Sequence, residues 1–359
     1  MENRYPHLFT PLKLGAIPLP NRIIMAPLTR ARTEVDHIPT ELMAEHYAQR
    51  ASGGLIIAEA TMAMEGCSSF WKEPGIYSEA QIAGWKKVTD AVHAKGGRIV
   101  LQIWHGGRTC HPALNNGKEA IAPSAIAVED EVHTPEGKLP YTMPLALRLD
   151  EIQTIIEGFK QAAINAKLAG FDGVEVHGAN GYLLDQFLRD GSNQRTDNYG
   201  GSIENRARLL LEVLATVCGV WGSDRVGLRI SPLNSFNSML DSDPLALTKW
   251  LSEKLNEFNL AFLHVMRSDF FGIHKADILS IAEQFYQGNI IGNMGYDAKE
   301  AEAEIAAGNL EAVAFGVSYL ANPDLPERLK AGAELNQPNP DTFYTPGAVG
   351  YTDYPFMNT

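Results

Sequence analysis

Short apolar segments alternate with amphipathic stretches along most of the 359-residue chain. Each apolar segment is almost continuously hydrophobic, as a strand buried on both faces requires. Eight such segments occur, at residues 23–26, 55–60, 99–103, 173–176, 226–230, 261–265, 289–292 and 312–315. Between them, apolar residues recur at helical spacing, most clearly over 80–95, 150–163 and 203–220.

Eight strand–helix units predict an α/β fold, a single (β/α)8 TIM barrel over residues 1–359, with an open doubly wound sheet as the alternative. Asp150 is expected to cap the helix that begins at Glu151. Residues 1–20 precede the first strand and are expected to plug the lower face of the barrel. Residues 106–148 form a long Gly- and Pro-rich segment after the third strand, expected to cap or line a site. Residues 334–359 are expected to form a tail that packs back on the protein.

Composition narrows the class of protein. The net charge of -13 and the absence of a Lys/Arg run argue against a nucleic-acid or anionic membrane partner. The three cysteines are widely spaced, which indicates neither a disulfide framework nor a metal knuckle and fits a reducing compartment. No apolar run is long enough to cross a bilayer, and the N-terminus has no apolar signal core. We expect a cytoplasmic protein without a metal site.

Candidate chemistry is concentrated after the fourth apolar segment. His177 ends that segment, and Asn180 and Tyr182 follow it. In a parallel barrel, side chains just past the C-terminal end of a strand line the active site. Two hydrogen-bond donors beside a phenol suit polarising a carbonyl and giving a proton to a neighbouring carbon. Alternatively, Tyr182 is a core aromatic, and His177 and Asn180 are bases or ligands.

Polar residues in other predicted strands have two readings each. Arg229 closes the fifth strand, where a buried charge is costly unless it meets an anion. It either pairs with Glu175 or another carboxylate, or faces a cofactor that becomes negative. Gln102 either satisfies a backbone group or binds the edge of a heterocycle, to which Thr29 can add one hydrogen bond.

Glycines and aromatic residues also follow the predicted strands, at the end of the barrel that we call its mouth. No GxGxxG motif follows a strand, so a separate dinucleotide domain is not supported. Gly292, Gly295 and Gly316 lie at the ends of the last two strands, where they form either ordinary turns or a phosphate site. Aromatics in the loops past strand ends and in the tail suggest an apolar pocket, although each alone also suits a core: Phe70, Trp71, Trp104, Phe236 and Tyr351.

Together these residues form a recognisable set, and the chain resembles the old yellow enzyme family of FMN-dependent ene-reductases nearly end to end. The resemblance is carried by residues 21–30 (NRIIMAPLTR), 101–108 (LQIWHGGR), 177–182, 192–206 (SNQRTDNYGGSIENR), 229–232 (RISP), 321–325 (ANPDL) and 350–355 (GYTDYP). It implies a (β/α)8 barrel with tightly bound FMN and NADPH or NADH as the electron donor.

The resemblance also implies roles for the cofactor site. Thr29 would bond the flavin C4 carbonyl, where a sister branch of the family has Cys, and Arg229 would lie by N1 and the C2 carbonyl. Ala60 and Gln102 would contact the isoalloxazine. The residues implied to bind FMN are Ala26, Pro27, Leu28, Thr29, Ala60, Gln102, Arg229, Met294, Gly295, Gly316 and Val317.

For catalysis, the resemblance implies that His177 and Asn180 hold the substrate carbonyl, that hydride comes from flavin N5, and that Tyr182 gives the proton. The substrate pocket would include these three residues and Phe70, Trp104, Phe236 and Tyr351. The implied substrates are small activated alkenes: α,β-unsaturated carbonyls, maleimides or nitroalkenes. We expect a monomer or homodimer. The alternatives are a flavin-binding redox sensor and a dienoyl-CoA-reductase-like enzyme, although the latter would need a cysteine cluster and extra domains.

Two departures from the family pattern affect the site. The family commonly has Gly-Arg after the eighth strand, with Arg on the FMN phosphate, whereas this chain has Gly316-Val317. The phosphate is then expected to rely on main-chain N–H groups around Met294, Gly295, Gly316 and Val317, or on an arginine from elsewhere. Phe70 stands where the family often has Tyr, which removes a hydroxyl from the pocket.

Overall fold

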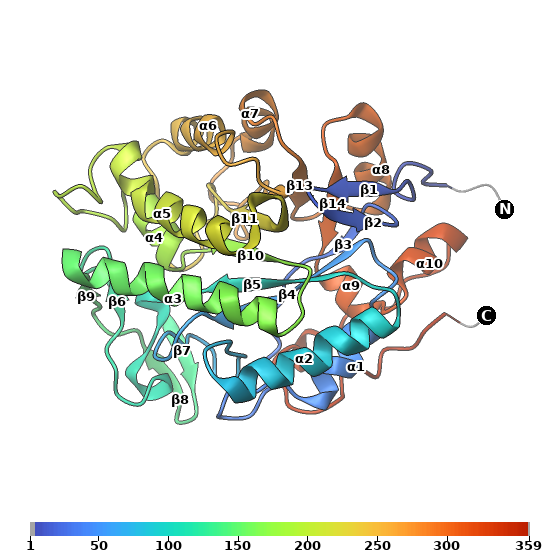
Figure 1. Cartoon of the computed structure of the whole chain (residues 1–359), viewed down its shortest axis with the longest axis horizontal. Helices are drawn as coiled ribbons and strands as arrows, with labels where there is room; N and C mark the ends of the chain where they lie inside the picture. The colour runs from blue at the N-terminus through green and yellow to red at the C-terminus, as the bar shows by residue number, and fades with distance from the viewer. Residues whose placement is uncertain (1–3, 358–359) are drawn as a thin grey trace.

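The computed structural model describes residues 4–357, and its centre is a closed barrel of eight parallel strands (Figure 1). Closure confirms the (β/α)8 prediction over the open sheet. Around the barrel the strands are β3 (Ile23–Met25), β4 (Leu55–Met62), β5 (Ile99–Trp104), β10 (Gly173–Gly178), β11 (Val226–Ile230), β12 (Phe262–Met266), β13 (Ile290–Asn293) and β14 (Ala312–Phe315).

Helices surround the barrel. They are α1 (Glu41–Gln49), α2 (Glu79–Ala94), α3 (Leu149–Leu168), α4 (Leu183–Leu188), α5 (Ile203–Trp221), α6 (Pro244–Leu255), α7 (Ile278–Phe285), α8 (Ala298–Ala307), α9 (Val317–Ala321) and α10 (Leu325–Ala331). Helix α3 corrects one prediction, because its N-cap is Arg148 and not Asp150. The Glu151 carboxylate accepts the Arg148 N–H at 2.8 Å, and Asp150 lies in the first turn, paired with the Arg148 guanidinium.

Alternation along each strand separates two environments. In β10, Val174 and Val176 belong to the large apolar cluster that includes helix residues, so Glu175 and His177 face the barrel interior. The lower part of that interior is apolar and contains Ile24, Leu55, Ile57, Val100, Phe262, Ile291 and Ala312. Polar side chains therefore gather toward the carboxyl ends of the strands.

An N-terminal hairpin covers the amino end of the barrel. It consists of β1 (Leu12–Leu14) and β2 (Ile17–Leu19), paired antiparallel. Its apolar side chains join the inward-facing cluster of the barrel, and the Ala16 N–H donates to the Asp224 carbonyl at 2.8 Å. This confirms the expected plug for residues 4–20; residues 1–3 lie outside the described residues. The hairpin lies at the right of Figure 1.

The long segment after β5 lies at the other end of the molecule (left in Figure 1). It contains the parallel pair β6 (Ile121–Ala122) and β9 (Leu145–Ala146), and the antiparallel hairpin of β7 (Glu131–Thr134) and β8 (Gly137–Pro140). Short 3-10 turns occur here and elsewhere, at Gly107–Thr109, Pro112–Leu114, Ser223–Arg225 and Pro340–Thr342. Arg195 fastens the chain on both sides of the β7–β8 hairpin, because its Nη1 donates to the carbonyls of Pro123 and Leu147.

The C-terminal tail returns to the barrel as expected, for the part that ends at residue 357. Arg50, buried at the end of α1, donates to the carbonyls of Leu320 at 2.6 Å and Tyr351 at 3.2 Å. Arg32 donates to the carbonyls of Thr342 and Gly347. Residues 358–359 of the predicted tail lie outside the described residues.

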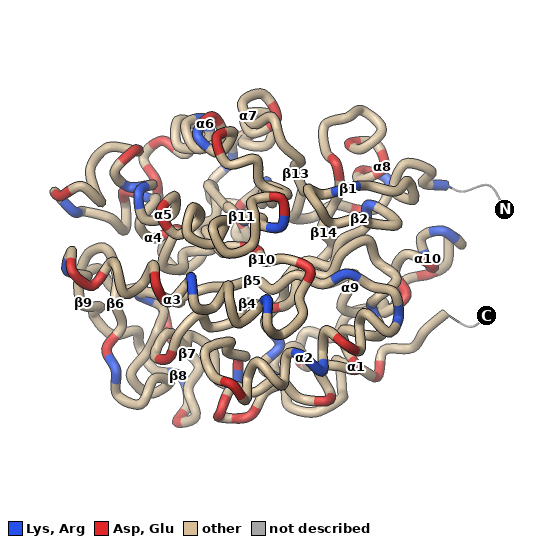
Figure 2. The backbone as a smooth tube through the Cα atoms, viewed as in Figure 1, with Lys and Arg blue, Asp and Glu red and all other residues tan. Residues whose placement is uncertain are grey.

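Two observations concern possible nucleic-acid and membrane partners. Figure 2 shows acidic and basic residues interspersed along the backbone. Within residues 4–357, no helix combines the length and the hydrophobicity needed to span a membrane.

Gly227 in β11 provides a test of the barrel packing. A Cβ at this position would lie 2.1 Å from the ring of Phe262 on the neighbouring strand. We expect Gly227→Ala to lower the free energy of unfolding by about 1–3 kcal/mol, the usual cost of overpacking, measured by urea denaturation. Gly219 in α5 is the control, because a Cβ there meets nothing within 4 Å. Unchanged stability of the Gly227 variant would contradict this packing.

Candidate active site

Three rings meet past the carboxyl ends of β5 and β10. The ring centroids of Trp104 and Tyr182 lie 4.3 Å apart in a T-shaped pair, and those of His177 and Tyr182 lie 5.2 Å apart. Ala60 of β4 packs in the same cluster, with Phe70 against it. The structure therefore brings the predicted catalytic histidine and tyrosine together with three other predicted site residues.

Asn180 is held by hydrogen bonds that orient its amide. Its backbone has a φ of 57°, in the left-handed region that Asn tolerates better than most residues. The Asn180 N–H donates to Ser231 Oγ at 2.7 Å, and its Oδ1 accepts from Asn234 Nδ2 at 2.8 Å. Asn237 Nδ2 donates to the Asn180 carbonyl at 2.8 Å. With Oδ1 occupied, the Nδ2 group is left to donate to a ligand.

Buried arginines hold the loop that supplies these partners. Arg189 donates through both terminal nitrogens to the Asn234 carbonyl, at 2.7 and 2.5 Å. Arg108 donates to the carbonyls of Asn237 at 2.8 Å and Ser238 at 3.0 Å. Sequence reasoning missed Asn234 and Asn237, and the one available signal was their place directly after the fifth strand.

His177 is neutral in this environment. Burial lowers the pKa of its imidazole well below the usual value, and the charge of Arg229 acts in the same direction. The ring makes no hydrogen bond to any described residue, and its buried Nδ1 has no partner. A neutral imidazole keeps one N–H, so His177 can donate one hydrogen bond to a ligand.

Tyr182 keeps its proton at neutral pH. Burial raises the pKa of its phenol well above the usual value. The hydroxyl therefore reaches a reaction as a proton donor and not as a phenolate. That state suits a general acid acting on a carbon that has gained negative charge.

A cavity of about 560 Å³ opens over these residues. Phe70, Tyr182 and Phe236 line it, as predicted for substrate contacts. The other predicted substrate contacts Trp104, His177 and Asn180 do not line it, although the Trp104 and His177 rings lie 4.3 and 5.2 Å from the Tyr182 ring. The β7–β8 hairpin supplies one wall through Glu131–Thr134, which confirms the expectation that the long segment after the third strand lines a site.

Tyr351 is not brought to this cavity, which corrects its predicted substrate contact. Its side chain is fully buried and stacks on His46 with ring centroids 3.8 Å apart. The Arg32 guanidinium lies 4.9 Å from the centre of the same ring. The tail residue that lines the cavity is Tyr344, whose ring stacks on Phe70 at 6.2 Å.

The hydrogen bonds of Arg229 and Gln102 inside the barrel bear on the two readings of each residue. Arg229 donates to Asn293 Oδ1 at 2.8 Å and makes no hydrogen bond to Glu175. Its buried Nε has no partner among the described residues. Gln102 Nε2 donates to Glu175 Oε1 at 2.7 Å, while no described residue donates to Gln102 Oε1. Both side chains therefore have hydrogen-bonding capacity left for a ligand.

The loops after β13 and β14 form the predicted phosphate region. Met294 and Gly295 both have positive φ, 88° and 75°, and the strained Met294 backbone is held by Arg267 Nε, which donates to its carbonyl at 2.9 Å. A Cβ on Gly295 would meet only Arg267 within 4 Å, and one on Gly316 only Leu28. Both glycines thus leave room for an approaching group. Val317 is 42% exposed and supplies no cation.

The remaining predicted cofactor residues follow β3, which pairs with β14. The Ala26 N–H donates to the Phe315 carbonyl at 2.9 Å, and Ala26 and Pro27 are buried. Leu28 and Thr29 are half-buried, and Leu28 lies beside Gly316. The loop after β3 therefore adjoins the phosphate region.

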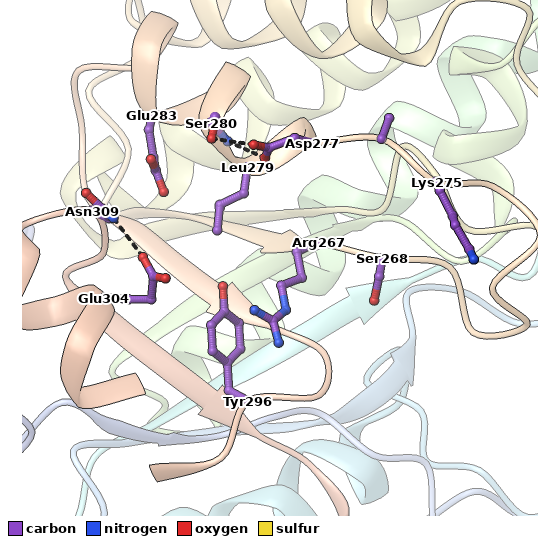
Figure 3. A pocket seen from close by; sticks show the side chains of 11 residues that line it. Arg267, Ser268, Lys275, Asp277, Leu279, Ser280, Glu283, Tyr296, Glu304 and Asn309 are labelled. Atoms are coloured by element: carbon purple, nitrogen blue, oxygen red, sulfur yellow. Dashed lines mark hydrogen bonds between the residues drawn. The ribbon is translucent and has the colours of Figure 1, made fainter. Parts of the chain in front are cut away.

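A second groove of about 780 Å³ lies on the outer side of the barrel (Figure 3). Arg267, Lys275 and Tyr296 line it together with residues of α7 and α8. Arg267 is already paired there with Glu300, at 2.5 and 2.9 Å. None of the predicted catalytic residues lines this groove, so it is distinct from the cavity at the mouth.

The residues at the mouth fit an anionic, planar heterocycle with a phosphate. Buried donors without partners, on Arg229 and His177, face the polar end of the barrel, and open glycine turns stand at the ends of the last two strands. The fold and the site define a (β/α)8-barrel flavin oxidoreductase.

Comparisons with known proteins agree with that class. A model described as the NADH:flavin oxidoreductase / NADH oxidase family matches residues 7–336. A probable flavin mononucleotide-dependent alkene reductase of Leishmania infantum is 51% identical over 357 residues, covering 98% of this chain and 97% of the relative. 12-Oxophytodienoate reductase 1 of Oryza sativa subsp. japonica is 42% identical over 98% of this chain and 93% of its own.

Solved structures are equally similar. Morphinone reductase in complex with tetrahydroNAD has a TM-score of 0.94 and 48% identity, with 98% of each chain covered. The old yellow enzyme from Trypanosoma cruzi has a TM-score of 0.96 and 46% identity, covering 99% of this chain and 100% of that one. The chain belongs to the NADH:flavin oxidoreductase / NADH oxidase family. It is an FMN-dependent, NAD(P)H-using ene-reductase of the old yellow enzyme type that acts on small molecules.

The neutral state of His177 predicts how ligand binding depends on pH. A histidine with an ordinary pKa would gain a proton near pH 6.5, whereas the lowered pKa keeps this ring neutral. We expect the dissociation constant of a phenol, measured spectroscopically between pH 5.5 and 8, to change by less than about twofold. If the histidine did titrate in this range, each pH unit below its pKa would change that constant by up to about tenfold. His177→Asn serves as the control. A step centred near pH 6.5 that disappears in this variant would contradict the neutral assignment.

Proposed function

We propose that the substrates are activated alkenes, in which a carbonyl or nitro group is conjugated to the C=C bond: α,β-unsaturated carbonyls, maleimides and nitroalkenes. The observation that carries this proposal is the pair of free donors, the His177 ring and Asn180 Nδ2, next to the protonated phenol of Tyr182. Two donors and one acid match the needs of a carbonyl oxygen and its α-carbon.

The cofactor is proposed to lie across the polar end of the barrel. Gln102 Oε1 and Arg229 would meet its pyrimidine edge, and Thr29 and Ala60 would contact the ring from β3 and β4. When bound, FMN supplies hydride that it has received from NAD(P)H. Arg229 is placed to stabilise negative charge at that edge, because it is buried and has an unpartnered Nε.

Main-chain N–H groups of Met294, Gly295, Gly316 and Val317 are proposed to bind the phosphate. The open space in front of the two glycines supports this, and so does the left-handed backbone at Met294 and Gly295. Arg267 lies at the edge of this loop and braces it through the Met294 carbonyl. We infer that it contributes by holding the loop, since Glu300 already occupies its guanidinium.

The substrate oxygen is proposed to accept hydrogen bonds from His177 and Asn180. These donors withdraw electron density from the conjugated bond, which makes the β-carbon electrophilic. They stabilise the charge that develops on the oxygen as hydride arrives. Because Asn180 is fixed by three hydrogen bonds, its amide needs no reorientation during the reaction.

Tyr182 is proposed to donate its hydroxyl proton to the α-carbon. Its ring is held edge-on against Trp104, and Phe70 and Phe236 line the same cavity. The phenol is then reprotonated from solvent through the cavity. NAD(P)H is proposed to use the same cavity before the alkene, which gives ping-pong kinetics. The structural similarity to morphinone reductase, which was solved in complex with tetrahydroNAD, supports binding of a nicotinamide cofactor.

A redox sensor without turnover is the competing proposal. The free donors beside Tyr182 favour the enzyme, because a sensor has no need of a carbonyl site with its own acid. We further propose a cytoplasmic monomer or homodimer. The net charge of -13 supports the additional proposal that it has no nucleic-acid partner.

Replacing both donors tests the carbonyl site. We expect His177→Ala combined with Asn180→Ala to lower kcat/KM for an enone by about 100-fold or more. This corresponds to a loss of roughly 3 kcal/mol or more of transition-state stabilisation, because charge-stabilising donors are lost. Flavin content, measured by absorbance after denaturation, is expected to stay near that of the wild-type protein. Parallel loss of flavin and activity would instead assign a structural role to the two residues.

Tyr182→Phe tests the proton donor, with stopped-flow absorbance separating the two half-reactions. Reduction of the flavin by NADPH is expected to proceed at the wild-type rate, because it needs no proton from this phenol. Reoxidation by an enone is expected to slow by about 100-fold or more, within the usual range for a general acid. Phe70→Tyr is the matched control, since it adds a hydroxyl nearby without removing the acid. An equal decrease in both half-reactions of Tyr182→Phe is the outcome that rejects the assignment.

A further inference from the structure

The carboxylate of Glu175 is fully buried inside the barrel, and neutral donors occupy both of its oxygens. Oε1 accepts from Gln102 Nε2 at 2.7 Å, and Oε2 accepts from His264 Nδ1 at 2.8 Å. Burial lowers the pKa of His264, so this ring is neutral at pH 7 and does not balance the carboxylate with a charge of its own. This contact could not be predicted from the sequence, because His264 lies within an apolar segment.

Arg229 is the cation that shares this environment. The strand register places it opposite His177 on β10 and opposite His264 on β12. Glu175 is the largest of the charges that raise the pKa of Arg229, although burial lowers it overall. The carboxylate and the guanidinium therefore interact through space, without a hydrogen bond between them in the described residues.

Glu175 also determines which way the Gln102 amide faces. A carboxylate only accepts hydrogen bonds, so the NH2 end of the amide must be the end that meets it. Gln102 Oε1 and the second N–H of its amide are then free to bind a ligand at the polar end of the barrel. Without Glu175, the two ends of the amide would have no fixed assignment.

We propose that Glu175 is a positioning residue of the flavin site, which orients Gln102 and, by its charge beside Arg229, lowers the reduction potential of the bound flavin. The inference rests on the proposed function, because it requires FMN against Gln102 and Arg229. Hydride transfer to the flavin adds two electrons and one proton, which leaves one extra negative charge on the ring. Arg229 favours that charge, and Glu175 opposes it.

A lower potential weakens the flavin as a hydride acceptor and strengthens it as a donor. Glu175 is therefore expected to favour the oxidative half-reaction with the alkene at the expense of the reductive half-reaction with NAD(P)H. Opposite changes in the rates of the two half-reactions are a result that a purely structural role of Glu175 would not produce.

Glu175→Gln removes the charge while preserving both contacts. The new amide oxygen can accept from Gln102 Nε2. Its NH2 group can donate to His264 Nδ1 once the ring proton moves to Nε2, which has no partner now. We expect the equilibrium constant for two-electron reduction to rise about tenfold or more, or at least about 30 mV, in a spectroscopic titration against a reference dye. NADPH should reduce the flavin faster, and an enone should reoxidise it more slowly.

Glu175→Leu separates the two parts of the role and repeats the charge test if Glu175→Gln does not fold. It should raise the potential similarly and also weaken FMN binding, measured by fluorescence, because Gln102 loses its anchor. Glu302→Gln is the control. Glu302 lies in α8, outside the barrel strands, and accepts the N–H groups of His7 and Leu8 at 3.0 and 2.9 Å. Its substitution should leave the potential unchanged.

The outcomes distinguish the inference from the function on which it rests. A wild-type potential in the Glu175 variants overturns the charge effect, and wild-type FMN affinity in Glu175→Leu overturns the positioning of Gln102. If the wild-type protein cycles normally between NADPH and an enone, only the role of Glu175 has failed. If the wild-type flavin cannot be cycled at all, the proposed function fails and this inference falls with it.

Discussion

Burial of a guanidinium and a carboxylate inside one barrel constrains the rest of the site. A closed parallel barrel turns every second side chain inward, and its lower interior is filled with apolar groups. The charges of Glu175 and Arg229 are tolerated only because neutral donors and acceptors from three other strands, Gln102, His264 and Asn293, contact them. This arrangement leaves donors with no protein partner facing the mouth. The same donors are what a flavin requires.

Much of the fold and the catalytic core could be predicted from the sequence. Strands buried on both faces are continuously hydrophobic, so the eight barrel strands could be predicted, and His177 lies near the carboxyl end of one of them, β10. The pair proposed to bind the substrate carbonyl, His177 and Asn180, was selected by residue type and by the resemblance. What fixes Asn180 was not predictable, because Asn234 and Asn237 lie in an irregular loop with no periodic pattern.

Errors occurred where local sequence does not determine packing. Tyr351 and Tyr344 both belong to an aromatic, Gly-rich tail, and only the path of that tail decides which ring faces the cavity. The choice depends on Arg32 and His46, which are distant in sequence and hold Tyr351 in the core. Likewise, Arg148 in place of Asp150 as the α3 cap reflects competition between adjacent polar residues.

The hairpin of β7 and β8 contributes a wall of the cavity but no strand of the barrel. It belongs to one continuous segment, and Arg195 donates to the carbonyls of Pro123 and Leu147 on either side of the hairpin. Insertions, deletions or exchanges within this hairpin can therefore reshape the entrance while the flavin floor and the proton donor stay in place. The shape of the entrance and the polar interior of the barrel are thus built by separable parts of the chain, so that evolution or engineering can alter one without rebuilding the other.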